Sequence, residues 1–144
     1  MPCGKTHLKI ESTIALVLFP SVFYLSYTWP KLSFINVSCF CVGYLLGSFF
    51  LNPDMDLFKS DGLNRWGPFK YFWLPYSKIC KHRGLSHSWL FGSATRFSYL
   101  LIFAIPFIYF FPEILDFKFK VLFVFFGCWF ANALHLIADR HWAF

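Results

Sequence analysis

The apolar residues of this chain are gathered into four runs, and this grouping constrains the fold more than any other feature. Residues 12–29 and 32–51 contain no charged side chain, 89–112 contain only Arg96, and 121–138 contain none. About 20 apolar residues, rising about 1.5 Å each, cross the ~30 Å hydrocarbon core of a bilayer. The sequence therefore predicts an all-α polytopic membrane protein. We expect a single membrane domain over residues 1–144, with four transmembrane helices at about 12–29, 32–51, 89–112 and 119–139.

Composition supports the same class. The chain is 58% hydrophobic and only 14% charged, and 22 of its 144 residues are Phe. A soluble domain of this length has too little interior to bury so much apolar surface. The first run follows Lys5 and Lys9, but no small-x-small cleavage site follows it, and it ends in the interfacial residues Tyr27 and Trp29. We therefore expect it to be a helix of the mature protein and not a signal peptide.

The basic residues predict the orientation in the membrane. Nine of the 13 Lys and Arg lie in the N-terminal segment, the segment 52–88 and the C-terminal end, and only Lys31, Lys118 and Lys120 lie in the two short opposite loops. By the positive-inside rule, the face with nine basic residues is cytoplasmic. The expected localisation is a bacterial inner membrane, with both termini in the cytoplasm.

The long segment 52–88 has the composition of a membrane interface. It mixes Pro, Gly and basic residues with aromatic residues that include Trp66, Phe69, Tyr71, Phe72, Trp73 and Tyr76. This mixture predicts a cytoplasmic-face loop in the head-group layer, with aromatic rings toward the lipid and charges toward water. The net charge of +6 is then explained by a basic rim on anionic lipids. No nucleic-acid partner is expected, and the sequence leaves open whether the chain forms an oligomer.

Four groups of metal-ligating residues share this predicted cytoplasmic face. Each group also has an ordinary structural explanation. Asp54-x-Asp56 could terminate a helix, His82 and His87 could be polar residues of the interface, and His135 and Asp139 could form a helix–helix hydrogen bond. Their occurrence together on one face favours a metal site. The predicted ligands are His7, Asp54, Asp56, His82, His87, His135 and Asp139.

This ligand set indicates the metal and the chemistry. Seven ligands are too many for one tetrahedral zinc ion, so we expect one or two divalent ions, with zinc favoured over manganese or iron. Two metals sharing a carboxylate, Asp54 or Asp56, are typical of phosphoester hydrolysis by activated water. Arg83 is predicted to bind phosphate oxygens, and Ser86 to orient a ligand or substrate. Arg96 could also bind phosphate, or could reach the interface along its aliphatic stem.

Three motifs carry a family resemblance. They are Asn-Pro-Asp-Met-Asp at 52–56, Arg-Trp-Gly-Pro at 65–68 and Lys-His-Arg-Gly-Leu-Ser-His-Ser at 81–88, and Gly-Lys-Thr-His at 4–7 fits the same pattern. With these motifs the chain resembles uncharacterised metal-binding membrane proteins that are common in cyanobacteria. It is also similar to the YdjM-type inner-membrane proteins predicted to be metal-dependent hydrolases. The resemblance implies a helical metal site and phosphoester hydrolysis.

The sequence thus predicts a membrane-embedded metal-dependent hydrolase of a phosphate ester. A phospholipid is the favoured substrate, because the site lies at head-group depth. Two other classes stay open. One is a non-catalytic protein that binds or transports metal, and the other is a structural or assembly factor whose His/Asp cluster joins the helices. The apolar outer halves of the helices count against transport.

Overall fold

The computed structural model describes residues 4–29, 31–57, 60–80, 88–89 and 91–141, and this part of the chain is helical throughout, without a β-strand. Four long helices form the frame, and short helices fill the segment between the second and third. The elements in chain order are α1 Gly4–Thr28, α2 Phe34–Phe49, η1 Pro53–Asp56, α3 Asp61–Asn64, η2 Gly67–Trp73, α4 Leu74–Ile79, α5 Phe91–Phe110, η4 Pro112–Phe117 and α6 Lys118–His141.

Three helices are long and apolar enough to cross a membrane: α1, α5 and the continuous helical segment ending in α6. The second predicted span, 32–51, is instead a helix of 16 residues. At about 1.5 Å per residue it is about 24 Å long, shorter than the ~30 Å core. Asn52-Pro53 limits it, because proline disfavours the helical conformation in the residue before it. The all-helical architecture is confirmed, whereas four complete spans stay a prediction.

The first helix also begins earlier than the predicted 12–29. It starts at Gly4, so His7 and Glu11 lie on the helix itself and not in a lead segment before it. The last helix likewise continues past Asp139 to His141. Both extensions carry polar side chains on regular helical turns at the ends of apolar helices.

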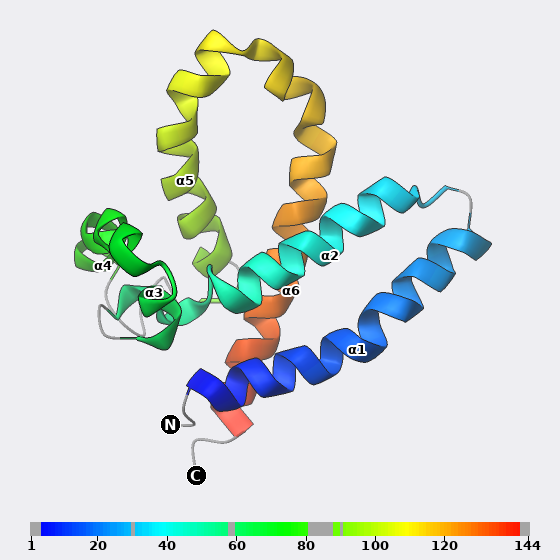
Figure 1. Cartoon of the computed structure of the whole chain (residues 1–144), viewed down its shortest axis with the longest axis horizontal. Coiled ribbons are helices and arrows are strands. Elements are labelled where there is room, and N and C mark those ends of the chain that lie inside the picture. The colour runs from blue at the N-terminus through cyan, green and yellow to red at the C-terminus, as the bar shows by residue number, and fades with distance from the viewer. Residues whose placement is uncertain (1–3, 30, 58–59, 81–87, 90, 142–144) are drawn as a thin grey trace.

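Helices α2 and α6 cross at very short range (Figure 1). A Cβ added at Gly47 would lie 2.9 Å from the Cα of Cys128, and one added at Gly43 or Gly127 would overlap the backbone of the facing helix. The Gly43-x-x-x-Gly47 spacing places both glycines on one face of α2. In a membrane, where apolar burial does not drive association between helices, such close backbone contact lets van der Waals packing hold them together.

The segment predicted as an interfacial loop packs onto the ends of α2 and α5. Its residues Trp66 and Phe72 pack against a buried core that contains Trp73, Met55 and Leu63. Arg65 Nη1 donates a 3.0 Å hydrogen bond to the carbonyl of Phe49, which satisfies a free carbonyl at the end of α2. The prediction that no long helix fits here agrees with the short helices observed, while a head-group location stays a prediction.

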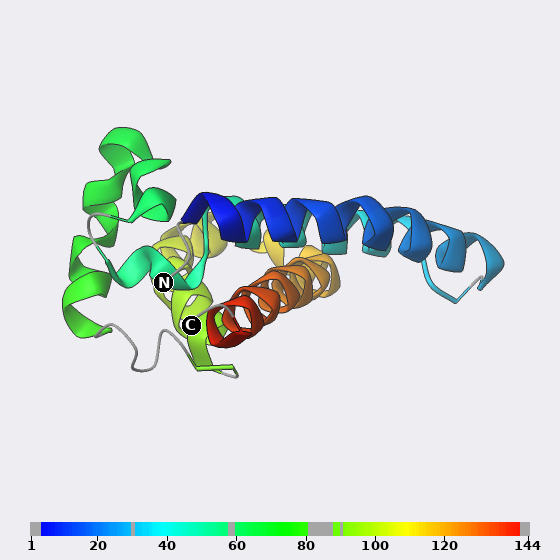
Figure 2. The ribbon, with the colours of Figure 1, turned by 90° about the horizontal axis from the view of Figure 1, so that it is seen from below.

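This packing brings three distant parts of the chain to one end of the molecule. The first turns of α1 lie beside the last turns of α6, and η1 lies next to both, as the two views show (Figures 1 and 2). The polar side chains of all three elements therefore face each other.

Candidate metal centre

Two helices each contribute a pair of polar side chains four residues apart. On α1 the pair is His7 and Glu11, and on α6 it is His135 and Asp139. A spacing of four residues places both members of a pair on one helix face. His7, Glu11 and His135 are all buried, and His135 is 3% exposed. Buried polar groups of this kind require partners, so their arrangement matters more than their number.

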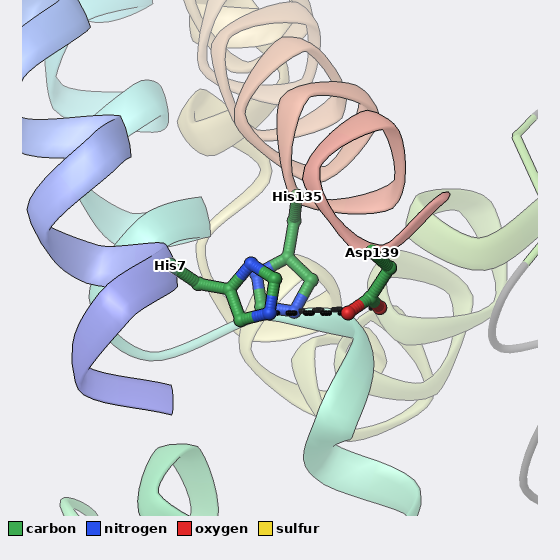
Figure 3. Close-up of side chains that lie close together, drawn as sticks. All are labelled: His7, His135 and Asp139. Atoms are coloured by element: carbon green, nitrogen blue, oxygen red, sulfur yellow. Dashed lines mark ion pairs between the residues drawn. The ribbon is translucent and has the colours of Figure 1, made fainter. Parts of the chain in front are cut away.

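The imidazoles lie against each other with a carboxylate at their edge (Figure 3). The rings of His7 and His135 are stacked, with centroids 4.2 Å apart and planes inclined by 24°. Nε2 of His7 is 3.1 Å from Oδ1 of Asp139. One potential ligand atom from each of these three residues lies within 4.8 Å of the others. That spacing is compatible with a shared cation.

Asp54 approaches the same point from η1. Its Oδ2 lies 3.6 Å from Nε2 of His135, and Oδ2 of Asp139 lies 4.0 Å from the same nitrogen. A direct N–H···O hydrogen bond is about 2.7–3.2 Å long, so neither distance is a good hydrogen bond. Two atoms bound to one zinc ion, each about 2.0–2.2 Å from it, lie roughly 3–4 Å apart. The spacing suits an ion between the groups.

Glu11 sets the orientation of His135. Its Oε1 lies 2.9 Å from Nδ1 of the imidazole. An ionised carboxylate only accepts hydrogen bonds, so Nδ1 is the donor, and a neutral His135 then has its lone pair on Nε2. Among the described residues, this buried Nε2 has no hydrogen-bond partner. A buried lone pair directed at two carboxylates suits a metal-ligating nitrogen.

The cluster contains more carboxylates than imidazoles. Glu11, Asp54 and Asp139 supply three carboxylates around two histidines. Charging both histidines would place two stacked cations 4.2 Å apart, which is unfavourable. A divalent cation would offset two of the three negative charges with both rings neutral, and the charge of Arg96 also interacts with Asp54.

The other predicted site residues are not part of this group. Asp56 is buried in η1 and interacts electrostatically with Arg96, and it does not belong to the cluster formed by His7, His135 and Asp139. His82, Arg83, Ser86 and His87 lie outside the described residues. The seven-ligand, two-metal centre therefore stays a prediction, and the described residues bring together His7, Asp54, His135 and Asp139.

Arg96 is buried inside the helix bundle. Its side chain is 1% exposed, and its Nε donates a 2.9 Å hydrogen bond to the carbonyl of Gly92, one turn earlier in α5. Asp56 and Asp54 both interact with its charge. For Arg96, extension to the membrane surface and binding of phosphate oxygens both stay predictions. Its burial among acidic groups makes it a counter-charge within the helix bundle.

Sequence reasoning missed Glu11. The residue lies one position before the first apolar run. A carboxylate at that position is usually interpreted as an ordinary charge at the end of a helix. Its four-residue spacing from His7 was the available signal, since it mirrors the spacing of His135 and Asp139. That signal becomes informative only once the helix is known to begin at Gly4.

Fold and site thus define a helical protein with membrane-length helices and a buried His/carboxylate cluster at one end. The model of a family described as "Uncharacterized metal-binding protein (DUF2227)" matches residues 2–119, and the chain belongs to this family. The matched region includes His7 and Asp54 and ends before His135. The metal-binding part of the predicted resemblance is confirmed at the level of the family description.

A relative from Aquifex aeolicus (strain VF5), an "Uncharacterized protein", is 43% identical over 61 residues. The alignment covers 42% of this chain and 43% of the relative, so it spans less than half of either protein. Neither match links the chain to the YdjM-type hydrolases. No solved structure matches the chain significantly.

Proposed function

We propose that this chain is a metal-binding membrane protein in which His7, His135, Asp139 and Asp54 hold one divalent cation. The observation that carries the proposal is that the two ring nitrogens of His135 have different surroundings. Its Nδ1 is used by Glu11, while its buried Nε2 faces carboxylate oxygens at 3.6 and 4.0 Å. The description of the family as metal-binding supports the same function.

A metal-free ion-pair cluster is the competing interpretation. In that case a doubly protonated His135 would donate to Glu11 on one side and to Asp54 on the other. The 3.6 Å separation from Asp54 is long for such a charged hydrogen bond, which is normally about 2.7–2.9 Å. The stacked rings disfavour a charge on both histidines at once, so in this interpretation His7 is neutral. The long separation from Asp54 favours a cation between the groups.

Zinc is the favoured ion. Two imidazole nitrogens and carboxylate oxygens, with no thiolate in the group, suit zinc and also manganese or iron. His7, His135 and Asp139 converge on one point, and Asp54, 3.6 Å from His135, would complete the four ligands that zinc takes in tetrahedral structural sites.

The proposed setting is a bacterial inner membrane with the centre at its cytoplasmic face. The basic residues support this orientation, and the apolar lengths of α1, α5 and α6 support membrane insertion. Thiol labelling of single-Cys variants from outside intact cells tests it. We expect labelling at Ser33→Cys and protection at Ser60→Cys, and the opposite pattern would reverse the orientation.

A second function, phosphoester hydrolysis, is favoured by the unequal burial of the ligands. Asp54 is 23% and Asp139 17% exposed, whereas the histidines are buried, so the carboxylate side of the centre is open. A divalent cation there would polarise a phosphoryl oxygen and promote ionisation of water. The second carboxylate oxygen of Asp54, which does not face His135, could then accept a proton on the open side. Asp56, Arg83 and Ser86 keep their proposed catalytic roles under this alternative, with a phospholipid as the favoured substrate.

Metal analysis of the detergent-purified protein tests the primary proposal. We expect about one equivalent of zinc in the wild type, and a loss of most of it in His135→Ala and Asp139→Asn. Asp116→Asn is the matched control, because this exposed carboxylate lies in η4, away from the centre. Full zinc content in both site variants would reject the site.

The same preparations separate the two functions. Zinc-loaded protein assayed against phospholipids, nucleotides and model phosphodiesters should hydrolyse one of them if the centre is catalytic. Metal-replete protein inactive on the whole panel would leave the non-catalytic alternative, a cation that joins α1, η1 and α6.

A further inference from the structure

We propose that Glu11 is a positioning residue for the metal centre: it holds the imidazole of His135 so that Nε2 is free to bind the cation. This inference rests on the proposed function and deepens it. It assigns a role to a carboxylate that is not expected to contact the metal itself.

The first observation is the direction of the contact. Oε1 of Glu11 is on the Nδ1 side of His135, whereas Asp54 and Asp139 lie on the Nε2 side. The three carboxylates therefore occupy opposite edges of one ring. Only those on the Nε2 edge can share a cation with that nitrogen, and the Glu11 carboxylate can act only through the ring.

The second observation is that Glu11 is itself held in place. Its side chain is buried, and the hydroxyl of Tyr44, on α2, donates a 2.8 Å hydrogen bond to the backbone carbonyl of Glu11. Tyr44 is fully buried between α1, α2 and α6. The Tyr44 bond holds the backbone at Glu11 and burial restricts the side chain, so the carboxylate can orient the ring that donates to it.

The chemical consequence follows from the tautomer. A hydrogen bond from Nδ1–H to a carboxylate keeps the proton off Nε2, orients the ring and increases the basicity of the ligating nitrogen. Loss of such an outer partner typically weakens metal binding by about 10–100-fold, although no ligand is removed. For a buried imidazole, where the ring cannot turn toward water for another partner, the full effect is expected.

The alternative, purely structural interpretation is that Glu11 and His135 only cross-link α1 to α6. A cross-link would affect the stability of the metal-free protein and leave the affinity of the centre unchanged. A positioning role affects zinc affinity even where the metal-free protein is as stable as the wild type. The two interpretations are therefore separated by measuring both quantities on the same variants.

The test uses full-length protein in detergent, with zinc affinity from competition against a chromophoric chelator and metal-free stability from thermal melting. Glu11→Gln keeps the shape and one acceptor oxygen, and should weaken zinc binding by about 10-fold. Glu11→Leu removes the acceptor and should weaken it by up to about 100-fold. Glu113→Gln, an exposed glutamate in η4, is the matched control and should bind zinc as the wild type does.

Zinc-edge X-ray absorption on the wild type and Glu11→Gln completes the test. If Glu11→Leu does not fold, the zinc affinity and the absorption spectrum of Glu11→Gln are sufficient to test the proposal. We expect the same number of metal ligands in both proteins. Unchanged zinc affinity in Glu11→Gln and Glu11→Leu would overturn the positioning role alone, as would loss of one oxygen ligand in Glu11→Gln, which would make Glu11 a ligand. A wild type that takes up no zinc would overturn the proposed function and this inference with it.

Discussion

Among the contacts of helix α6, two are of opposite character. In its first half it meets α2 where Gly127 faces the backbone of Phe40 and Gly43 faces the backbone of Val124, so the two backbones are in direct contact. In its last turns it meets α1 and η1 through His135 and Asp139, with buried imidazoles and carboxylates. The same helix thus contacts α2 by close backbone packing and contacts α1 and η1 through polar and charged side chains.

The difference indicates which of the two contacts is expected to remain in the metal-free protein. Close-packed helices in a membrane are held by van der Waals contact, which does not depend on ions. Buried charges are costly unless they are paired, so the second contact depends on whatever balances its carboxylates. We therefore expect the α2–α6 crossing to persist in the metal-free protein, and the α1–α6 contact to weaken.

The largest effect is expected from filling the crossing. In Gly127→Leu the new side chain would overlap the backbone of α2 at Phe40 and Tyr44. Overpacking of this kind costs about 1–3 kcal/mol, and more where backbone is the obstacle. We expect no monodisperse protein on gel filtration, with or without zinc. Ser21→Leu on the exposed face of α1 is the control, and should behave as the wild type. Rescue of Gly127→Leu by zinc would show that the crossing is not independent of the metal.

A smaller and metal-specific effect is expected at the other contact. His7→Ala should fold, because the α2–α6 crossing is intact, but it should lose the stabilisation that zinc gives the wild type. A ligand at 100 times its dissociation constant contributes about 2.7 kcal/mol. Thermal melting with and without zinc measures the difference, and Asp116→Ala in η4 is the control. A variant that gains as much from zinc as the wild type does would remove His7 from the centre.

The smallest effect is expected at Tyr44, where the two contacts meet. Tyr44→Phe loses one hydrogen bond to the carbonyl of Glu11 and keeps the ring in its buried site. The expected loss is about 0.5–1.5 kcal/mol in the free energy of unfolding, with and without metal. Chemical denaturation in mild detergent measures it. Tyr109→Phe, at an exposed position of α5, should show no change, and an equal loss there would make the Tyr44 effect nonspecific.

The all-helical architecture, with helices long and apolar enough to cross a membrane, could be predicted from sequence because hydrophobic run length has a direct physical meaning in a bilayer. The approach of His7, Asp54, His135 and Asp139 was expected from topology, since all of them were assigned to one membrane face. Their actual distances depend on how far α1 extends toward its N-terminus and where α2 ends. The ends of these two helices depend on local packing, and the length of an apolar run does not determine that packing.

Two features lay outside what the pattern could indicate. The close crossing uses Gly43, Gly47 and Gly127, whose role is apparent only when the facing helix is known. Glu11 acts through His135, 124 residues away in the sequence, and such a pairing has no local signature. The short helices of the segment 52–80 likewise depend on an aromatic core that forms against α2 and α5.

Zinc-edge X-ray absorption of the zinc-loaded wild type, compared with His7→Ala and His135→Ala, tests the metal centre most directly. The structure predicts at least two imidazole ligands with oxygen ligands completing the shell, and a lower imidazole contribution in each variant, since one ion contacts both α1 and α6. A shell of oxygen alone, a sulfur ligand, or spectra that do not change in either variant would contradict a centre built from these two helices.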